Sequence, residues 1–245
     1  MPVLKSEPRT SKFKKTYDLL KKDDYDARIT RIVMLGRQEF TYTDRKTGVT
    51  ETKQNYAVEL AFELIGVDAT GKDHEGKPLE PRPSCMFQRY KLIPNSSRGN
   101  FLDIIKMVDP SVAKQPNDPD WLRDNLLGQP VNLSIDVWTS KDGSKSGNSF
   151  TVSPIPSKYR SGVGEARSEI LYFEPYTDND SNNQAYQKLY PYQRTALAEA
   201  LDKEVIPFAG REVNKAGDTE QNEGHSTVET VNQEPDVSYD DDAPF

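Results

Sequence analysis

The sequence predicts a mainly β fold with a helical insert, and three observations carry this prediction. Apolar residues alternate with polar or small residues over residues 55–65, which is the period of a half-buried strand. The same alternation returns over residues 131–137. Between these segments the period becomes helical, because apolar residues lie three or four positions apart in residues 101–108. The chain is therefore expected to place strands on both sides of a short helical segment.

Five strands and two helices are expected in order along the chain. The second helix is expected to begin after Asp118 as its N-cap, with Pro119 in its first turn, and to stop at Gly128. Gly36 is a candidate bulge in the first strand. The predicted order matches the OB-fold, a five-stranded Greek-key barrel with its helix between strands three and four, although other small β-barrels have a similar order. The strands are expected at residues 25–42, 55–65, 84–93, 131–137 and 149–155, with a hairpin turn at residues 44–48.

The chain divides into four expected regions. A basic N-terminal arm covers residues 1–24, and the OB-fold domain covers residues 25–156. Residues 157–212 hold an aromatic cluster and a helical pattern, and we expect them to pack on the barrel as a lid. Residues 213–245 contain almost nothing apolar, so they cannot bury enough surface to offset the entropy of ordering, and we expect a disordered acidic tail.

The charge is segregated between the body and this tail. The whole chain has a formal net charge of −7, with hydrophobic residues making up 34% and charged residues 29% of it. Residues 213–245 hold nine acidic residues and one basic residue, a balance of −8, so residues 1–212 carry +1. A nearly neutral body is compatible with an anionic ligand, because a basic groove on one face is sufficient to bind it.

Several classes of function are not supported by the sequence. Cys85 is the single cysteine, and His74 and His225 are far apart, so neither a disulfide nor a zinc site is expected, and no metal or cofactor. No phosphate-binding loop, nucleophile elbow or clustered metal-binding carboxylates are found, so we do not expect an enzyme. No apolar run of membrane-spanning length and no signal peptide are found, which favours a cytoplasmic protein without membrane contact.

The last six residues resemble a known interaction motif. They are Asp240, Asp241, Asp242, Ala243, Pro244 and Phe245, and they are similar to the C-terminal tip of bacterial single-stranded-DNA-binding proteins. The resemblance implies recruitment of replication, recombination and repair proteins, because Phe245 suits an apolar pocket, its carboxylate suits an arginine, and the aspartates suit a basic rim. A solubilising acidic tail is the plainer alternative. The basic arm and the extension beyond the barrel look more like the divergent single-stranded-DNA-binding proteins of bacteriophages.

This resemblance implies sequence-nonspecific binding of single-stranded DNA in the cytoplasm of a bacterial host. An OB-fold binds single strands across strands two and three and their flanking loops, with cations along the backbone and aromatic rings against bases. The candidates are Arg37, Phe40, Tyr42, Arg45, Lys46 and Lys53 in the first hairpin, Phe87, Arg89, Tyr90 and Lys91 in the third strand, Trp138, Lys141 and Lys145 near the loop after the fourth strand, and Lys158, Tyr159 and Arg160 after the fifth strand.

The alternation of side chains along each strand predicts which of these aromatic residues face the core and which face outward. Phe87 and Tyr90 have opposite parity, so at least one of them is expected in the core. Trp138 opposes the apolar row that ends at Val137, so we expect it to face outward and to be the best stacking candidate. The alternative function is an adaptor or decoy that binds host replication proteins through its tip without binding DNA.

Overall fold

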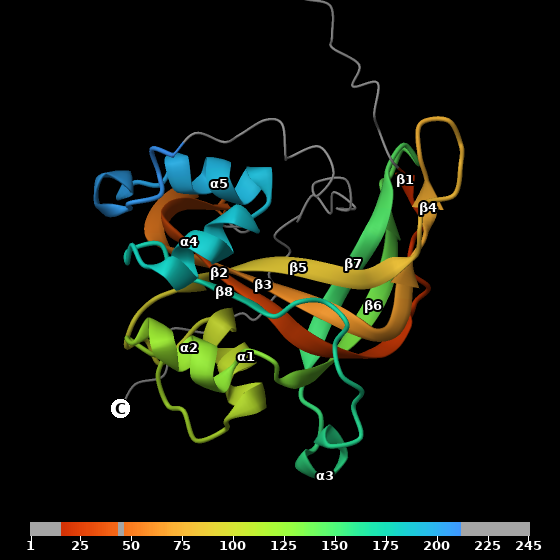
Figure 1. Ribbon diagram of the computed structural model, residues 1–245, viewed down its shortest axis with the longest axis horizontal. Helices are drawn as coiled ribbons and strands as arrows, with labels where there is room; N and C mark the ends of the chain where they lie inside the picture. Colours follow the sequence, from red (N-terminus) through yellow and green to blue (C-terminus); the bar gives the residue numbers. More distant parts are fainter. Residues whose placement is uncertain (1–15, 44–46, 212–245) are drawn as a thin grey trace, which may run out of the picture.

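The structure is a computed structural model that describes residues 16–43 and 47–211, and it confirms a mainly β fold. Five strands form one antiparallel sheet in the order β5-β3-β2-β6-β7, and the short β8 pairs with β2 in parallel (Figure 1). Their bounds are β2 Asp23–Thr43, β3 Thr50–Ala69, β5 Arg82–Leu92, β6 Pro130–Thr139, β7 Ser146–Ser153 and β8 Leu171–Phe173.

Two helices lie between the third and fourth long strands, as the sequence predicts. They are α1 (Asn100–Val108) and α2 (Pro119–Asn125). The predicted cap of α2 is confirmed, because the Asp118 side chain accepts a hydrogen bond of 3.0 Å from the backbone of Asp120. The predicted bulge is also confirmed, since Gly36 has a positive φ of 72° where the register of β2 and β3 shifts.

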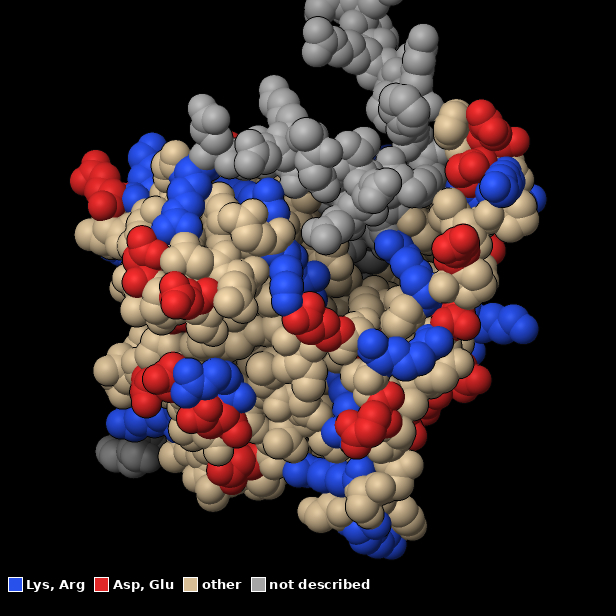
Figure 2. All heavy atoms as spheres, viewed as in Figure 1, with Lys and Arg blue, Asp and Glu red and all other residues tan. Residues whose placement is uncertain are grey.

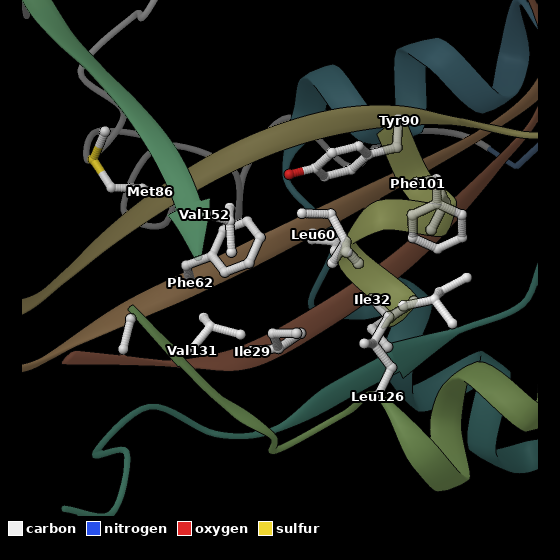
Figure 3. Close-up of a cluster of buried hydrophobic side chains, with 14 of the residues drawn as sticks. Ile29, Ile32, Leu60, Phe62, Met86, Tyr90, Phe101, Leu126, Val131 and Val152 are labelled. Atoms are coloured by element: carbon white, nitrogen blue, oxygen red, sulfur yellow. The ribbon is translucent and has the colours of Figure 1, made fainter. Parts of the chain in front are cut away.

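The main hydrophobic core lies between the inner face of the sheet and these two helices (Figure 3). The predicted apolar row of β3 is buried in it from Val58 to Leu64, as is the Val131–Ile135 part of β6, whereas Tyr56 at the start of the row is half-buried. Val137 is a correction, because its side chain is 41% exposed near the end of β6. The alternation therefore places the core correctly until the strand leaves it.

The predicted closure of the barrel is not observed. Within the described residues, no strand pairs with the second edge of β5, and β5 and β7 are not joined by backbone hydrogen bonds. The backbone of Leu20 instead exchanges two hydrogen bonds with the side chain of Asn148 on β7, each 2.9 Å long. Residues 17–20 therefore line the gap between β7 and β5.

The segment after β7 packs on the outer face of the sheet. Val33, Leu35 and Ala57 of β2 and β3 join a second hydrophobic cluster with Phe173, Leu197 and other residues of this segment. Figure 1 shows α4 and α5 side by side on the same part of the molecule. The elements are α3 (Ser157–Arg160), β8, α4 (Asp180–Gln187), α5 (Pro191–Ala198) and a 3-10 turn at Lys203–Val205.

The remaining ordered pieces are a two-residue pair, β1 (Thr16–Tyr17) with β4 (Gly71–Lys72). In the part of the chain that the structure describes, no helix has the length and apolar character needed to cross a membrane.

Candidate nucleic-acid interface

Strand β5 presents cations and aromatic rings on its outer row. Ser84, Met86 and Tyr90 point into the core and are buried, while Phe87 and Lys91 are half-buried and Arg89 is exposed. The row follows the pleat of a strand at an edge of the sheet, because alternate side chains point to opposite faces. Figure 1 shows β5 crossing the molecule between α4 and α5 on one side and β1, β4 and β7 on the other.

Neighbouring elements add partners to this row. The guanidinium of Arg82 lies 4.9 Å from the ring centroid of Tyr17, and the ammonium of Lys91 lies 5.1 Å from the ring of Phe40. The Phe87 ring meets Tyr190 edge-on at 5.7 Å. Cations and aromatic rings therefore lie together along β5. Phe87, Arg89 and Lys91 lie on its outer row, while Arg82, which has the parity of Ser84 and Met86, lies beside Tyr17 at the start of the strand. We name this surface the β5 stripe, and its members are Tyr17, Phe40, Arg82, Phe87, Arg89, Lys91 and Tyr190.

The segment after β7 contributes an aromatic pair to the stripe. Tyr190 stacks on Tyr192 with ring centroids 5.9 Å apart and planes 8° apart. Arg31 covers Tyr190 at 4.5 Å and donates a hydrogen bond to the carbonyl of Lys188. Tyr190 is also fixed as the N-cap of α5, since its backbone donates to the Gln193 side chain over 2.9 Å. The pair is therefore held in a fixed position beside Phe87.

A buried carboxylate joins this pair to the sheet. Glu59 of β3 is 6% exposed and accepts hydrogen bonds of 2.6 Å from both Tyr192 and Gln193. Arg89 of the stripe lies 3.6 Å from the same carboxylate. Burial and the nearby Glu59 charge raise the pKa of Tyr192, so its hydroxyl stays protonated and donates to Glu59.

The outer face of β3 is covered, which corrects the expected location of the interface. Ala57, Glu59, Ala61 and Glu63 point outward, yet all four are at most 6% exposed. The Glu63 carboxylate accepts hydrogen bonds of 2.7 Å from the backbone of Arg167 and of Ser168, so residues of the extension lie directly on it. The outer face of β3 is therefore covered, whereas the outer row of β5 is partly exposed.

Tyr90 is a second correction to the predicted interface. Its side chain is 5% exposed, and its ring lies 5.7 Å from Phe101 above Leu60 (Figure 3). The Tyr90 hydroxyl donates a hydrogen bond to the Gln88 side chain, and burial raises the pKa of Tyr90. The parity argument separates the two rings correctly, because Phe87 lies outside the core and Tyr90 inside it.

Arg160 is a third correction, because its guanidinium is engaged with backbone carbonyls. It donates to the carbonyls of Met107 and Val108 at the end of α1, over 2.7 and 3.0 Å, and to Ile155 over 3.0 Å. These contacts satisfy carbonyls that a helix end leaves without partners. Arg160 therefore has a structural role.

The other predicted residues lie apart from the row of β5. Arg37 contacts Gln54 at 3.4 Å, and Lys53 pairs with Glu51 at 3.3 Å. Trp138 is half-buried, with its ring against Gly147. The exposed remainder are Lys141 and Lys145 in the β6–β7 turn and Lys158 and Tyr159 in α3. The side chain of Tyr42, residues Arg45 and Lys46, and the tip from Asp240 to Phe245 lie outside the described residues.

Five residues of this arrangement are not among the candidates that the sequence predicts: Tyr17, Arg31, Arg82, Tyr190 and Tyr192. The segment Tyr190-Pro191-Tyr192 carries the only local signal, since two rings flank a proline that begins a helix. The proximity of these five residues to β5 depends on long-range packing. The alternation of apolar and polar residues within a strand gives no information about such packing.

Charge on the face crossed by β5 is mixed. Figure 2 shows Lys and Arg in several groups with Asp and Glu between them. Among the described residues, no carboxylate lies within ion-pair distance of Arg82, whereas Arg89 is paired with Glu59. Arg82 is therefore the stripe cation best placed to meet an anionic ligand.

Two further findings concern the identity of the site. The described residues contain no group of three or more His, Cys, Asp or Glu side chains arranged to hold a metal ion. Comparison of the chain with family models, with curated proteins and with solved structures finds no match.

Proposed function

We propose that this protein binds single-stranded DNA without sequence preference along the β5 stripe. The observation that carries the proposal is the proximity of cations and aromatic rings along one edge strand, completed by Tyr190 and Tyr192 from the extension. Cations track a phosphate backbone, and aromatic rings stack on the exposed faces of unpaired bases. The role is binding rather than catalysis, in replication, recombination or repair of phage DNA.

We also propose that the sheet is an OB-type arrangement with an open seam. The order β5-β3-β2-β6-β7, with α1 and α2 between the third and fourth long strands, supports this assignment. The departure is the missing pairing of β5 with β7. An open seam leaves one backbone edge of β5 available to a ligand.

The tip from Asp240 to Phe245 supports a second part of the proposal, which is recruitment of other replication and repair proteins. An acidic segment followed by proline and phenylalanine combines electrostatic attraction with one apolar anchor. An adaptor that does not bind DNA would use the same tip, but it would leave the cations and aromatic rings along β5 without a role.

Replacing Phe87 with leucine tests the stripe. Leucine keeps an apolar side chain but removes the π face, so the affinity for single-stranded DNA should fall by about 1–3 kcal/mol per base stacked. That energy corresponds to about a 5- to 150-fold rise in Kd. The measurement is fluorescence anisotropy with a labelled oligo(dT).

The matched control is Tyr159→Leu. Tyr159 is 59% exposed and belongs to α3, which lies away from β5 in Figure 1. This variant should bind as the unsubstituted protein does. If the affinity for oligo(dT) falls equally in both variants, or falls only in Tyr159→Leu, the binding surface is not the β5 stripe and the proposal is wrong.

A further inference from the structure

A cavity of about 220 Å³ adjoins the β5 stripe. Residues 82–87 of β5 form one wall, and residues 17–20, Asn148 and Ser168 form the others. Tyr17, Arg82, Phe87 and Tyr190 belong both to the lining of the cavity and to the stripe. A strand that follows the stripe therefore passes the mouth of this cavity.

The cavity exists because the sheet does not close. Paired strands lie about 4.8 Å apart and leave no space between their backbones. Here β5 has one edge hydrogen-bonded to β3, while no described strand pairs with the other edge. The unpaired N–H and C=O groups of an edge strand are available to another molecule, and in this segment they border the cavity.

We propose that this cavity receives one unstacked nucleobase of the bound single strand, an inference that rests on the proposed function. The rings of Phe87 and Tyr190 supply apolar contact in the lining. The backbone edge of β5 supplies both donors and acceptors, and the Ser168 hydroxyl can act as either, so the polar edges of different bases can be met there without sequence preference. Arg82, which faces no described carboxylate within ion-pair distance, meets the adjoining phosphate.

The chemistry of the lining favours a base over other ligands. A phosphate alone would leave the rings unused, and an apolar ligand would leave the backbone groups of β5 without partners, which is unfavourable in a buried site. A planar group with both an apolar face and a polar edge satisfies both parts of the lining. Unpairing is already complete in a single strand, so moving one base out of the stack requires little energy compared with a duplex.

Cys85 provides a reporter inside the cavity. It is the single cysteine of the chain, it lines the cavity, and its sulfur lies 3.9 Å from the Ser168 hydroxyl. Burial raises the pKa of this thiol to about 11, so a maleimide reacts slowly with it and the reaction is run at about pH 9, where the thiolate fraction is larger.

The experiment measures modification of Cys85 by N-ethylmaleimide in the full-length chain, alone, with oligo(dT) and with polyphosphate. At about 90% occupancy by oligo(dT) the rate should fall about tenfold, because only the free protein reacts. Polyphosphate occupies the cations but has no bases, so the rate should stay unchanged. Protection by both polymers, or by neither when anisotropy shows that oligo(dT) is bound, overturns the base pocket and leaves the proposed function standing. Absence of oligo(dT) binding overturns both.

A cavity-filling variant gives a readout that does not depend on thiol reactivity. Ser168→Trp places an indole in the cavity, and Ser157→Trp at an exposed position of α3 is its control. The first variant should bind oligo(dT) about tenfold more weakly, the loss expected from one base contact, while its affinity for polyphosphate is kept. Thermal unfolding verifies that both variants are folded. Unchanged oligo(dT) affinity in a folded Ser168→Trp protein overturns the inference.

Discussion

Two arginines of this protein have roles that the sequence does not reveal. Arg82, which stands between two prolines, covers the Tyr17 ring, whereas Arg160, which follows Tyr159, donates to three carbonyls. Lys158, Tyr159 and Arg160 form a basic and aromatic triplet, which is why the sequence predicts a DNA contact. The end of α1, which Arg160 caps, is about fifty positions away in the chain, so no local pattern reveals this contact.

The role of Arg160 predicts a stability effect without a binding effect. Arg160→Met keeps the aliphatic stem but removes three hydrogen bonds from a charged donor, so the free energy of unfolding should fall by about 2 kcal/mol. Urea denaturation measures it. Lys158→Met, two positions earlier and exposed, should change stability by less than about 0.5 kcal/mol. A destabilisation shared equally by the two variants, or weaker oligo(dT) binding by folded Arg160→Met protein, would argue against this assignment.

At the scale of elements, alternation identifies strands but not what covers their outer face. The row of β3 from Val58 to Leu64 is buried as predicted. Its opposite row contains Glu59 and Glu63, which the sequence presents as a solvated face. Both carboxylates are buried because the extension supplies hydrogen-bond donors to them. Which donors meet a carboxylate depends on tertiary packing, so the covered face could not be predicted from β3 alone.

Glu59 makes this packing testable. Glu59→Ala leaves Tyr192 and Gln193 without their buried acceptor and Arg89 without its ion pair, so stability should fall by about 3 kcal/mol. The affinity for oligo(dT) should fall as well, because the Tyr190–Tyr192 pair loses its anchor. Glu51→Ala, which removes an exposed pair with Lys53, should cost less than about 1 kcal/mol. If the two variants have the same unfolding free energy, Glu59 does not hold the extension on the sheet.

At the scale of the whole molecule, the negative charge is concentrated in residues 213–245, and the sequence alone shows this. A body of +1 precedes a segment of −8, and counting requires no structure. Strand order and class follow from periodicity in the same way. The open seam between β5 and β7 could not be predicted, because it depends on the contact between Leu20 and Asn148, which are 128 positions apart.

The acidic segment should compete weakly with DNA for the cations of the body. A chain that ends at Glu212 lacks the −8 segment and should bind oligo(dT) more tightly, by less than about tenfold. The gain should shrink as salt rises, because exposed charges more than about 8 Å apart are screened at physiological ionic strength. Anisotropy titrations of both chains at low and high salt measure this. Identical affinities at low salt would show that residues 213–245 do not reach the stripe.

The body should bind single strands in preference to duplex, because stacking requires base faces that a duplex hides. The measurement is the Kd of the full-length chain for a labelled oligo(dT) and for a duplex of the same length, at about 50 and 200 mM salt. The single strand should bind at least about tenfold more tightly, and its affinity should fall with salt as counterions are released. Equal affinity for the duplex, or affinity for the single strand that does not change with salt, would contradict the account.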